Sequence, residues 1–143
     1  MRLRTRFFLL LTLLTPYISE ADVPTSNSHD QKAVIDTAQT TAARELGKPV
    51  QLAIKTFNTE QGWAFIHATM LGADGQPFSY AGTEFAQAAE AGIKSTSYAA
   101  LLQRTHGGAW HMVVERIGPT DMAWADWSQQ YGAPPTLFGP IPK

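Results

Sequence analysis

Histidine residues are the first candidates for metal binding or proton transfer, because their side chains titrate near neutral pH. The chain contains four of them, His29, His67, His106 and His111. His106 lies in a predicted hairpin turn and His111 on the strand that follows, but a metal site needs three or four ligands, and no carboxylate stands at ligand spacing beside this pair. The sequence therefore predicts no metal site, and it indicates no cofactor.

The usual patterns of nucleophilic and glycosidic catalysis are missing from the chain. It has no cysteine, and no serine lies in a Gly-x-Ser-x-Gly or Ser-x-x-Lys sequence. Asp121 and Asp126 are a candidate carboxylate pair for sugar cleavage, but five residues apart on one predicted helix they face different directions. The sequence predicts no catalytic residue and favours a protein that acts by binding.

Aromatic residues near the C-terminus are the main binding candidates. Trp124, Trp127 and Tyr131 are predicted on one side of a helix that starts at Thr120 and has about three turns. They either bury against the rest of the domain, as a terminal helix does when it docks, or form a contact patch for a protein, peptide or glycan. The pattern leaves both interpretations open.

Three further candidates lie on the predicted strands and turns. His67 stands beside Phe65 on one strand face, where it either packs half-buried or contacts a ligand with a charge that changes near neutral pH. His106 lies in a glycine-containing turn of residues 105–109, and Trp110 opens the strand after it. The full set of binding candidates is Trp124, Trp127, Tyr131, His106, His67 and Trp110.

Residues 1–21 have the pattern of a secretory signal peptide. Three arginines precede an apolar run, and small side chains stand at the −3 and −1 positions before Asp22. The uncharged run over residues 7–19 has 13 residues, whereas a membrane-crossing helix needs about 20. We therefore expect cleavage before Asp22, no membrane span in the mature chain, and a periplasmic or secreted protein.

The mature remainder should form one domain. Removal of residues 1–21 takes three arginines and one glutamate from totals of 11 basic and 12 acidic residues, leaving 122 residues with a net charge of −3. That length supports one hydrophobic core. The negative charge and the scattered basic residues argue against binding to nucleic-acid phosphates. Because cysteine is absent, packing alone must stabilise the fold.

The periodicity of apolar residues predicts a flexible leader over residues 22–29 and a single α+β domain over residues 30–143. Apolar residues at three- and four-residue spacing predict a helix from Asp30 to Leu46. Gly47 follows at the position where glycine commonly ends a helix.

Alternating patterns after this helix predict two hairpins, over residues 50–70 and 97–117, with a short helix over residues 82–92 between them. We expect one long N-terminal helix packed on a curved antiparallel sheet of about four strands, followed by a short C-terminal helix.

The order of elements over residues 30–117 resembles that of cystatin-like and nuclear-transport-factor-like domains. The protease-binding glycine-valine loop of cystatins has no counterpart, and the opening helices of the transport-factor-like group reduce to one. Separately, Gly62-Trp-Ala-Phe65 together with Gly118-Pro-Thr-Asp-Met-Ala-Trp124 is similar to small uncharacterised exported proteins of Gram-negative bacteria. This resemblance implies export and brings no assigned chemistry.

These observations predict an exported binding protein without catalytic activity, with an inhibitor, immunity or accessory role toward another envelope protein or a peptide. The alternative is a pocket between the helix and the curved sheet that binds a small ligand or catalyses a reaction, lined by Phe65, His67, Tyr98 and Trp110. A structural envelope component that only self-associates is a third interpretation.

Overall fold

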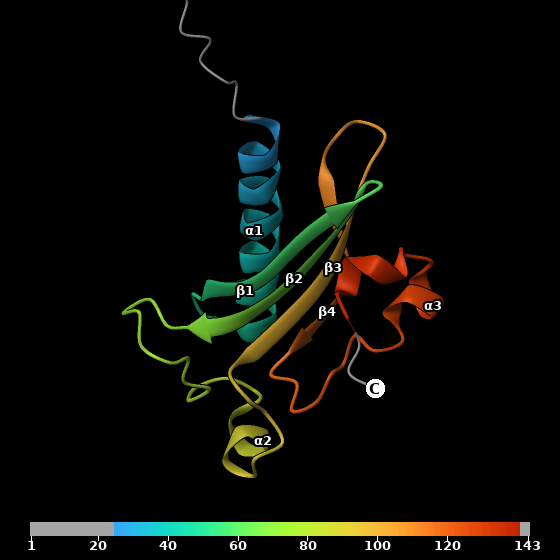
Figure 1. The fold of residues 1–143 in the computed structure, drawn as a ribbon. Helices are drawn as coiled ribbons and strands as arrows, with labels where there is room; N and C mark the ends of the chain where they lie inside the picture. The colour runs from blue at the N-terminus through green and yellow to red at the C-terminus, as the bar shows by residue number, and fades with distance from the viewer. Residues whose placement is uncertain (1–24, 141–143) are drawn as a thin grey trace, which may run out of the picture.

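The computed structural model describes residues 25–140, with one long helix, a four-stranded sheet and a short helical C-terminal segment (Figure 1). The predicted signal peptide over residues 1–21 and residues 22–24 of the predicted leader lie outside the described part. No helix of the described part is long and apolar enough to cross a membrane. The architecture is α+β, as the sequence predicts.

Helix α1 (Thr25–Leu46) covers one face of the sheet. Its buried side chains follow the predicted three- and four-residue spacing and are Val34, Ala38, Ala42 and Leu46. The two alanines leave room for a close approach to the sheet, whose own small residues Ala64, Ala68 and Ala100 belong to the same core. The interior between helix and sheet is therefore closely packed.

The start of α1 differs from the prediction. The helix begins at Thr25 rather than Asp30, so residues 25–29 of the predicted flexible leader are helical. The polar residues there give no apolar periodicity from which this extra turn could be predicted. The predicted end is confirmed, because Gly47 follows the last helical residue with a φ of 67°, a left-handed conformation that glycine adopts without steric cost.

Four antiparallel strands form one sheet in the order of the chain. Their bounds are β1 (Gln51–Glu60), β2 (Trp63–Leu71), β3 (Ser97–Arg104) and β4 (Trp110–Ile117). Both predicted hairpins are confirmed, and the pairing of β2 with β3 joins them into one continuous sheet.

Each outer strand of the sheet carries one extra residue. In β1 the register shifts between Ile54 and Thr56, so Lys55 has no partner on β2. In β4 the register shifts between Met112 and Val114, so Val113 has no partner on β3. These are β-bulges, which interrupt the hydrogen-bond ladder and increase the local twist.

The chain after β4 covers the second face of the sheet. Helix α3 (Trp127–Tyr131) and the 3-10 helix η1 (Pro135–Phe138) follow a stretch of turns. Their buried side chains, Trp127 and Leu137, share a core with Phe65 of β2. Figure 1 shows this segment on the side of the sheet away from α1, so the sheet is the middle of three layers.

The predicted helix of about three turns from Thr120 is wrong in length. Residues 121–126 form turns in which Ala123 N–H bonds to the Asp121 carbonyl, two residues back rather than four. Only Trp127–Tyr131 is α-helical. The turns allow Trp124 and Trp127 to contact the same Phe65 ring, so tertiary packing overrides the local helical pattern.

Residues 72–96 connect β2 to β3 and contain the short helix α2 (Ala86–Glu90), which is shorter than the predicted helix over residues 82–92. Phe78 and Tyr80 of this connection are buried against the core under α1. The Tyr80 hydroxyl donates a hydrogen bond of 2.6 Å to the Ser95 carbonyl, and this contact ties the two ends of the connection together.

Candidate functional site

The three aromatic candidates of the C-terminal segment lie against the sheet. Trp127 is 1% exposed and belongs to the core. Trp124 is half-buried, with its ring centroid 5.6 Å from that of Phe65 and 4.7 Å from that of His67. Tyr131 meets the Trp127 ring edge-on at 6.4 Å. These distances are typical of aromatic packing, so Trp127 serves the fold rather than a contact patch.

His67 is half-buried on the same face of the sheet. Its Nε2 atom lies 3.0 Å from the Ser97 hydroxyl oxygen, and the Trp124 ring covers it. Burial, together with the charge of Lys55, lowers the pKa of His67 below its ordinary value of 6.5. The lowered pKa favours the neutral imidazole, and packing against Trp124 together with the contact to Ser97 explains the position of the ring.

The predicted pocket between helix and sheet does not form from the four residues expected to line it. Phe65 and His67 face the C-terminal segment, whereas Tyr98 and Trp110 face α1. The reason is strand alternation, since Tyr98 pairs with Ala68 of β2, whose side chain lies on the opposite face from those of its neighbours His67 and Thr69. A single pocket cannot include side chains from both faces of the sheet.

Tyr98 has a different role under α1. It is fully buried, and its hydroxyl donates a hydrogen bond of 2.6 Å to Glu115 Oε2. Burial raises the pKa of Tyr98, and it also raises the pKa of the Glu115 carboxyl. Because Glu115 is half-buried, the pair lies at the border of the apolar interior, where it links β3 to β4.

Three chain segments meet at the end of the molecule where α1 begins. Arg104, at the end of β3, forms an ion pair with Asp30 of α1. Its backbone N–H donates a hydrogen bond of 2.7 Å to the Gly62 carbonyl in the β1–β2 turn. Its guanidinium lies 4.7 Å from the centre of the Trp110 ring. Arg104 thus joins α1 to both hairpin tips. Figure 1 shows these tips near the end of the molecule where α1 begins.

We call this region the hairpin-tip surface and define it as Asp30, Gln61–Gly62, Arg104, the turn of residues 105–109, and Trp110. A pocket of about 360 Å³ lies in it, lined by Asp30, Gln61–Gly62, Arg104 and Trp110 together with Thr59 and Glu60. All residues of the 105–109 turn are exposed, including His106. Two of the predicted candidates, His106 and Trp110, therefore lie together here.

The β1–β2 turn in this surface is a two-residue hairpin turn in which Gln61 and Gly62 both have positive φ, as in the type I′ turns that commonly join antiparallel strands. Gln61 has a φ of 49°, in the left-handed region that costs a non-glycine residue roughly 1–2 kcal/mol. Here the Gly62–Arg104 hydrogen bond holds the turn in place.

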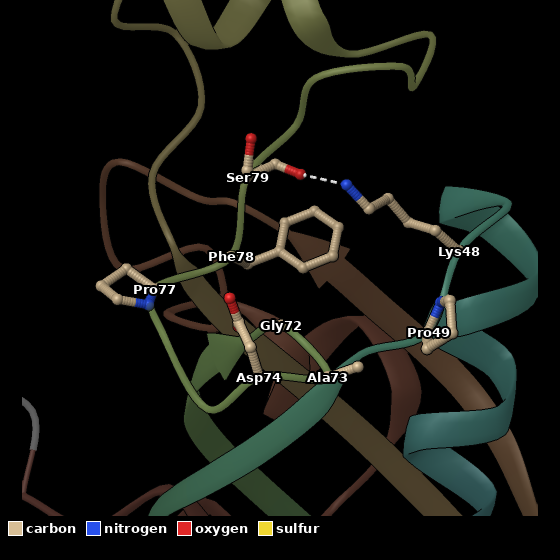
Figure 2. A pocket seen from close by; sticks show the side chains of 8 residues that line it. All are labelled: Lys48, Pro49, Gly72, Ala73, Asp74, Pro77, Phe78 and Ser79. Carbon is tan, nitrogen blue, oxygen red and sulfur yellow. Dashed lines mark hydrogen bonds between the residues drawn. The ribbon is translucent and has the colours of Figure 1, made fainter.

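A second pocket of about 360 Å³ lies at the opposite end of α1. Figure 2 shows its walls, which come from Lys48–Pro49, from Gly72–Asp74 after β2, and from Pro77–Ser79. The Lys48 side chain reaches across and donates a hydrogen bond of 2.8 Å to the Ser79 carbonyl. Sequence analysis did not identify this pocket, because no local pattern indicates that these three segments meet.

The arrangement of titratable side chains offers little for catalysis. Within residues 25–140, no group of three or more histidine, aspartate and glutamate side chains is placed to hold a metal ion. In the buried and half-buried residues of the same part of the chain, every side-chain nitrogen or oxygen atom that is buried has a hydrogen-bond partner. A comparison of the chain with protein-family models, curated proteins and solved structures finds no match.

Proposed function

We propose that this chain is an exported binding protein and that the hairpin-tip surface is where it contacts another protein. The predicted export signal of residues 1–21 would deliver it to the periplasm or the exterior of a Gram-negative cell. An inhibitor, immunity or accessory role toward an envelope protein fits a small domain of this kind, and nucleic acid is not expected as a partner.

The observation that carries this proposal is the convergence at Arg104. Segments that lie 74 residues apart in the sequence are held together there by the Arg104–Asp30 contact. Loops fixed by a rigid scaffold are the usual carriers of recognition, and fixing them in advance reduces the entropy lost on binding. The exposed turn of residues 105–109 beside the half-buried Trp110 ring gives this end both adaptable backbone and an aromatic anchor.

The absence of assembled catalytic groups in residues 25–140 supports binding over catalysis. His67 has a lowered pKa and is covered by Trp124, while His106 lies at an exposed turn and belongs to no group of three metal-binding side chains in the described residues. The hairpin-tip surface instead presents charged groups that are already paired, such as Arg104 with Asp30. This ion pair within the chain holds the surface in one arrangement before a partner binds.

The test is affinity capture from the envelope extract of a Gram-negative bacterium with the tagged, processed chain. The double variant His106→Glu and Ala109→Glu adds two negative charges to the exposed turn. The matched control, Gln129→Glu and Gln130→Glu, adds two charges to exposed positions of α3. Circular dichroism first verifies that both variants are folded.

We expect the wild type and the α3 control to capture the same stoichiometric protein, and the tip variant to lose it by at least tenfold. The purified partner should then bind the three chains in the same order. Retention by the tip variant with loss by the control would move the interface to the C-terminal segment and refute the proposal. Capture of no stoichiometric protein would also refute it.

A further inference from the structure

The pocket of Figure 2 carries an inference that is independent of the hairpin-tip surface. It lies where α1 passes into β1, at the far end of the helix from Asp30, and is separate from every residue of that surface. Its volume of about 360 Å³ is in the range of small-molecule sites, which begins near 300 Å³. Its lining decides which class of molecule can bind there.

The walls of this pocket are held in place by the backbone. Gly72 N–H bonds to the Gln76 carbonyl at 2.8 Å, and Phe78 N–H bonds to the Met70 carbonyl at 3.2 Å. The Asp74 carboxylate accepts the Gln76 N–H at 3.0 Å, which closes the turn. The pocket is therefore formed before any ligand enters, which lowers the entropic cost of binding.

Lys48 supplies a positive charge that no carboxylate within residues 25–140 neutralises. Its ammonium donates hydrogen bonds to the carbonyls of Ser79 at 2.8 Å and Ala81 at 3.3 Å, and it lies 5.1 Å from the centre of the Phe78 ring. Both acceptors are uncharged, and an ammonium has three donors. One N–H and the full charge of Lys48 therefore remain for a carboxylate.

Asp74 supplies the opposite charge on another wall of the pocket. Only one of its oxygens is engaged in the turn, and no cation of the described residues 25–140 lies within ion-pair distance of it. Figure 2 shows Asp74 and Lys48 on different walls, with Phe78 between them. Phe78 is only 4% exposed, so the apolar lining that a ligand can reach comes from Pro49 and Pro77, which are both exposed.

We infer that this pocket binds a small zwitterion, with the ligand carboxylate toward Lys48, its ammonium toward Asp74 and an apolar group over Pro49 and Pro77. Free amino acids and dipeptides share this chemistry. A separated cation and anion across an apolar surface favour a ligand with both charges over one with either alone. The site gives the protein a second, small-molecule ligand in addition to its proposed protein partner.

The experiment titrates the processed chain with leucine and with leucyl-leucine, followed by NMR chemical shifts of residues 72–79. N-acetylleucine lacks the ammonium, and leucinamide lacks the carboxylate. We expect at least one zwitterion to saturate the pocket at millimolar concentration or below, and the two blocked compounds to bind at least tenfold more weakly. Which of leucine and leucyl-leucine binds tighter identifies the source.

Two variants connect the binding to the charges. Lys48→Gln should weaken zwitterion binding at least tenfold, and Asp74→Asn should do the same while its amide oxygen still accepts the Gln76 N–H. Lys32→Gln, which removes an exposed charge from α1, is the matched control and should leave binding unchanged.

The inference is overturned if neither zwitterion saturates at millimolar concentration, or if the blocked compounds bind as well as the zwitterions. Equal binding by Lys48→Gln and the wild type would overturn it as well. The hairpin-tip variant His106→Glu and Ala109→Glu leaves this pocket intact, so its zwitterion binding should match the wild type whatever happens to protein capture. Failure of one proposal is thereby distinguishable from failure of the other.

Discussion

Replacing Trp127 by alanine tests how strongly the C-terminal segment is joined to the sheet. The ring is 1% exposed and has edge-on contacts with Phe65 at 6.4 Å, Phe138 at 6.5 Å and Tyr131 at 6.4 Å. Truncation of a buried tryptophan removes its transfer free energy and leaves a cavity, at a cost of about 3–5 kcal/mol. A domain of this size has a total stability of about 5–15 kcal/mol, so the loss should be large but measurable.

Urea denaturation followed by circular dichroism at 222 nm, a wavelength dominated by the helices, measures this cost. With a slope of about 1.5 kcal/mol per molar urea, a loss of about 4 kcal/mol lowers the midpoint by about 2.7 M. The slope itself should not change if the segment and the sheet unfold together. A second, earlier transition would instead mean that the C-terminal segment unfolds alone.

Two companion variants make the result specific. Trp124→Ala removes a half-buried ring that contacts Phe65 and His67, and we expect it to cost about 2 kcal/mol. Met122→Ala removes a side chain that is 37% exposed on the same segment, and it should cost less than about 0.5 kcal/mol. The reasoning is refuted if Trp127→Ala costs less than about 1 kcal/mol, or if Trp124→Ala costs as much as Trp127→Ala.

Three further predictions follow from the described features. Gln61→Gly should raise stability by about 0.5–1 kcal/mol, seen as a higher melting temperature, because it relieves the left-handed φ of 49°; a lower melting temperature would contradict the strain argument. Because the pKa of His67 is lowered in the fold, the folded state takes up its proton at lower pH than the unfolded chain, and stability should fall as pH drops below 6.5. Urea midpoints between pH 7 and pH 5 measure this slope, and it should be smaller in His67→Gln. Expression in a Gram-negative host should yield periplasmic protein whose mass corresponds to a chain beginning at Asp22, whereas recovery of the full chain from the cytosol would contradict the export prediction.

The layered part of the fold could be predicted from periodicity. Period-two alternation over Trp63–Leu71 assigns Ile66 and Phe65 to opposite faces, and both faces are indeed buried. Phe65 and Tyr98 lie on opposite faces of the sheet, which excludes a pocket that combines them. Alternation alone does not reveal this, because it also requires the register of β2 on β3. Register depends on contacts between distant segments, which a single sequence does not display.

The two pockets could not be predicted, because their key contacts join residues far apart in the chain. Arg104 and Trp110 face each other across the hairpin, and the predicted turn would place them together. Asp30, however, reaches Arg104 only through the packing of α1 on the sheet. Lys48 likewise meets Ser79 across 31 residues, and neither residue lies in a recognisable motif.

The extra residues in β1 and β4 have a consequence for the molecule in solution. An open sheet exposes backbone N–H and carbonyl groups along its two outer edges, and another copy of the chain can add to such an edge as a further strand. Lys55 and Val113 break the regular spacing of those groups on both sides, and Lys55 also places a charge at one border. Neighbouring molecules therefore find no uninterrupted template along either edge, which disfavours the addition of a fifth strand from another copy of the chain.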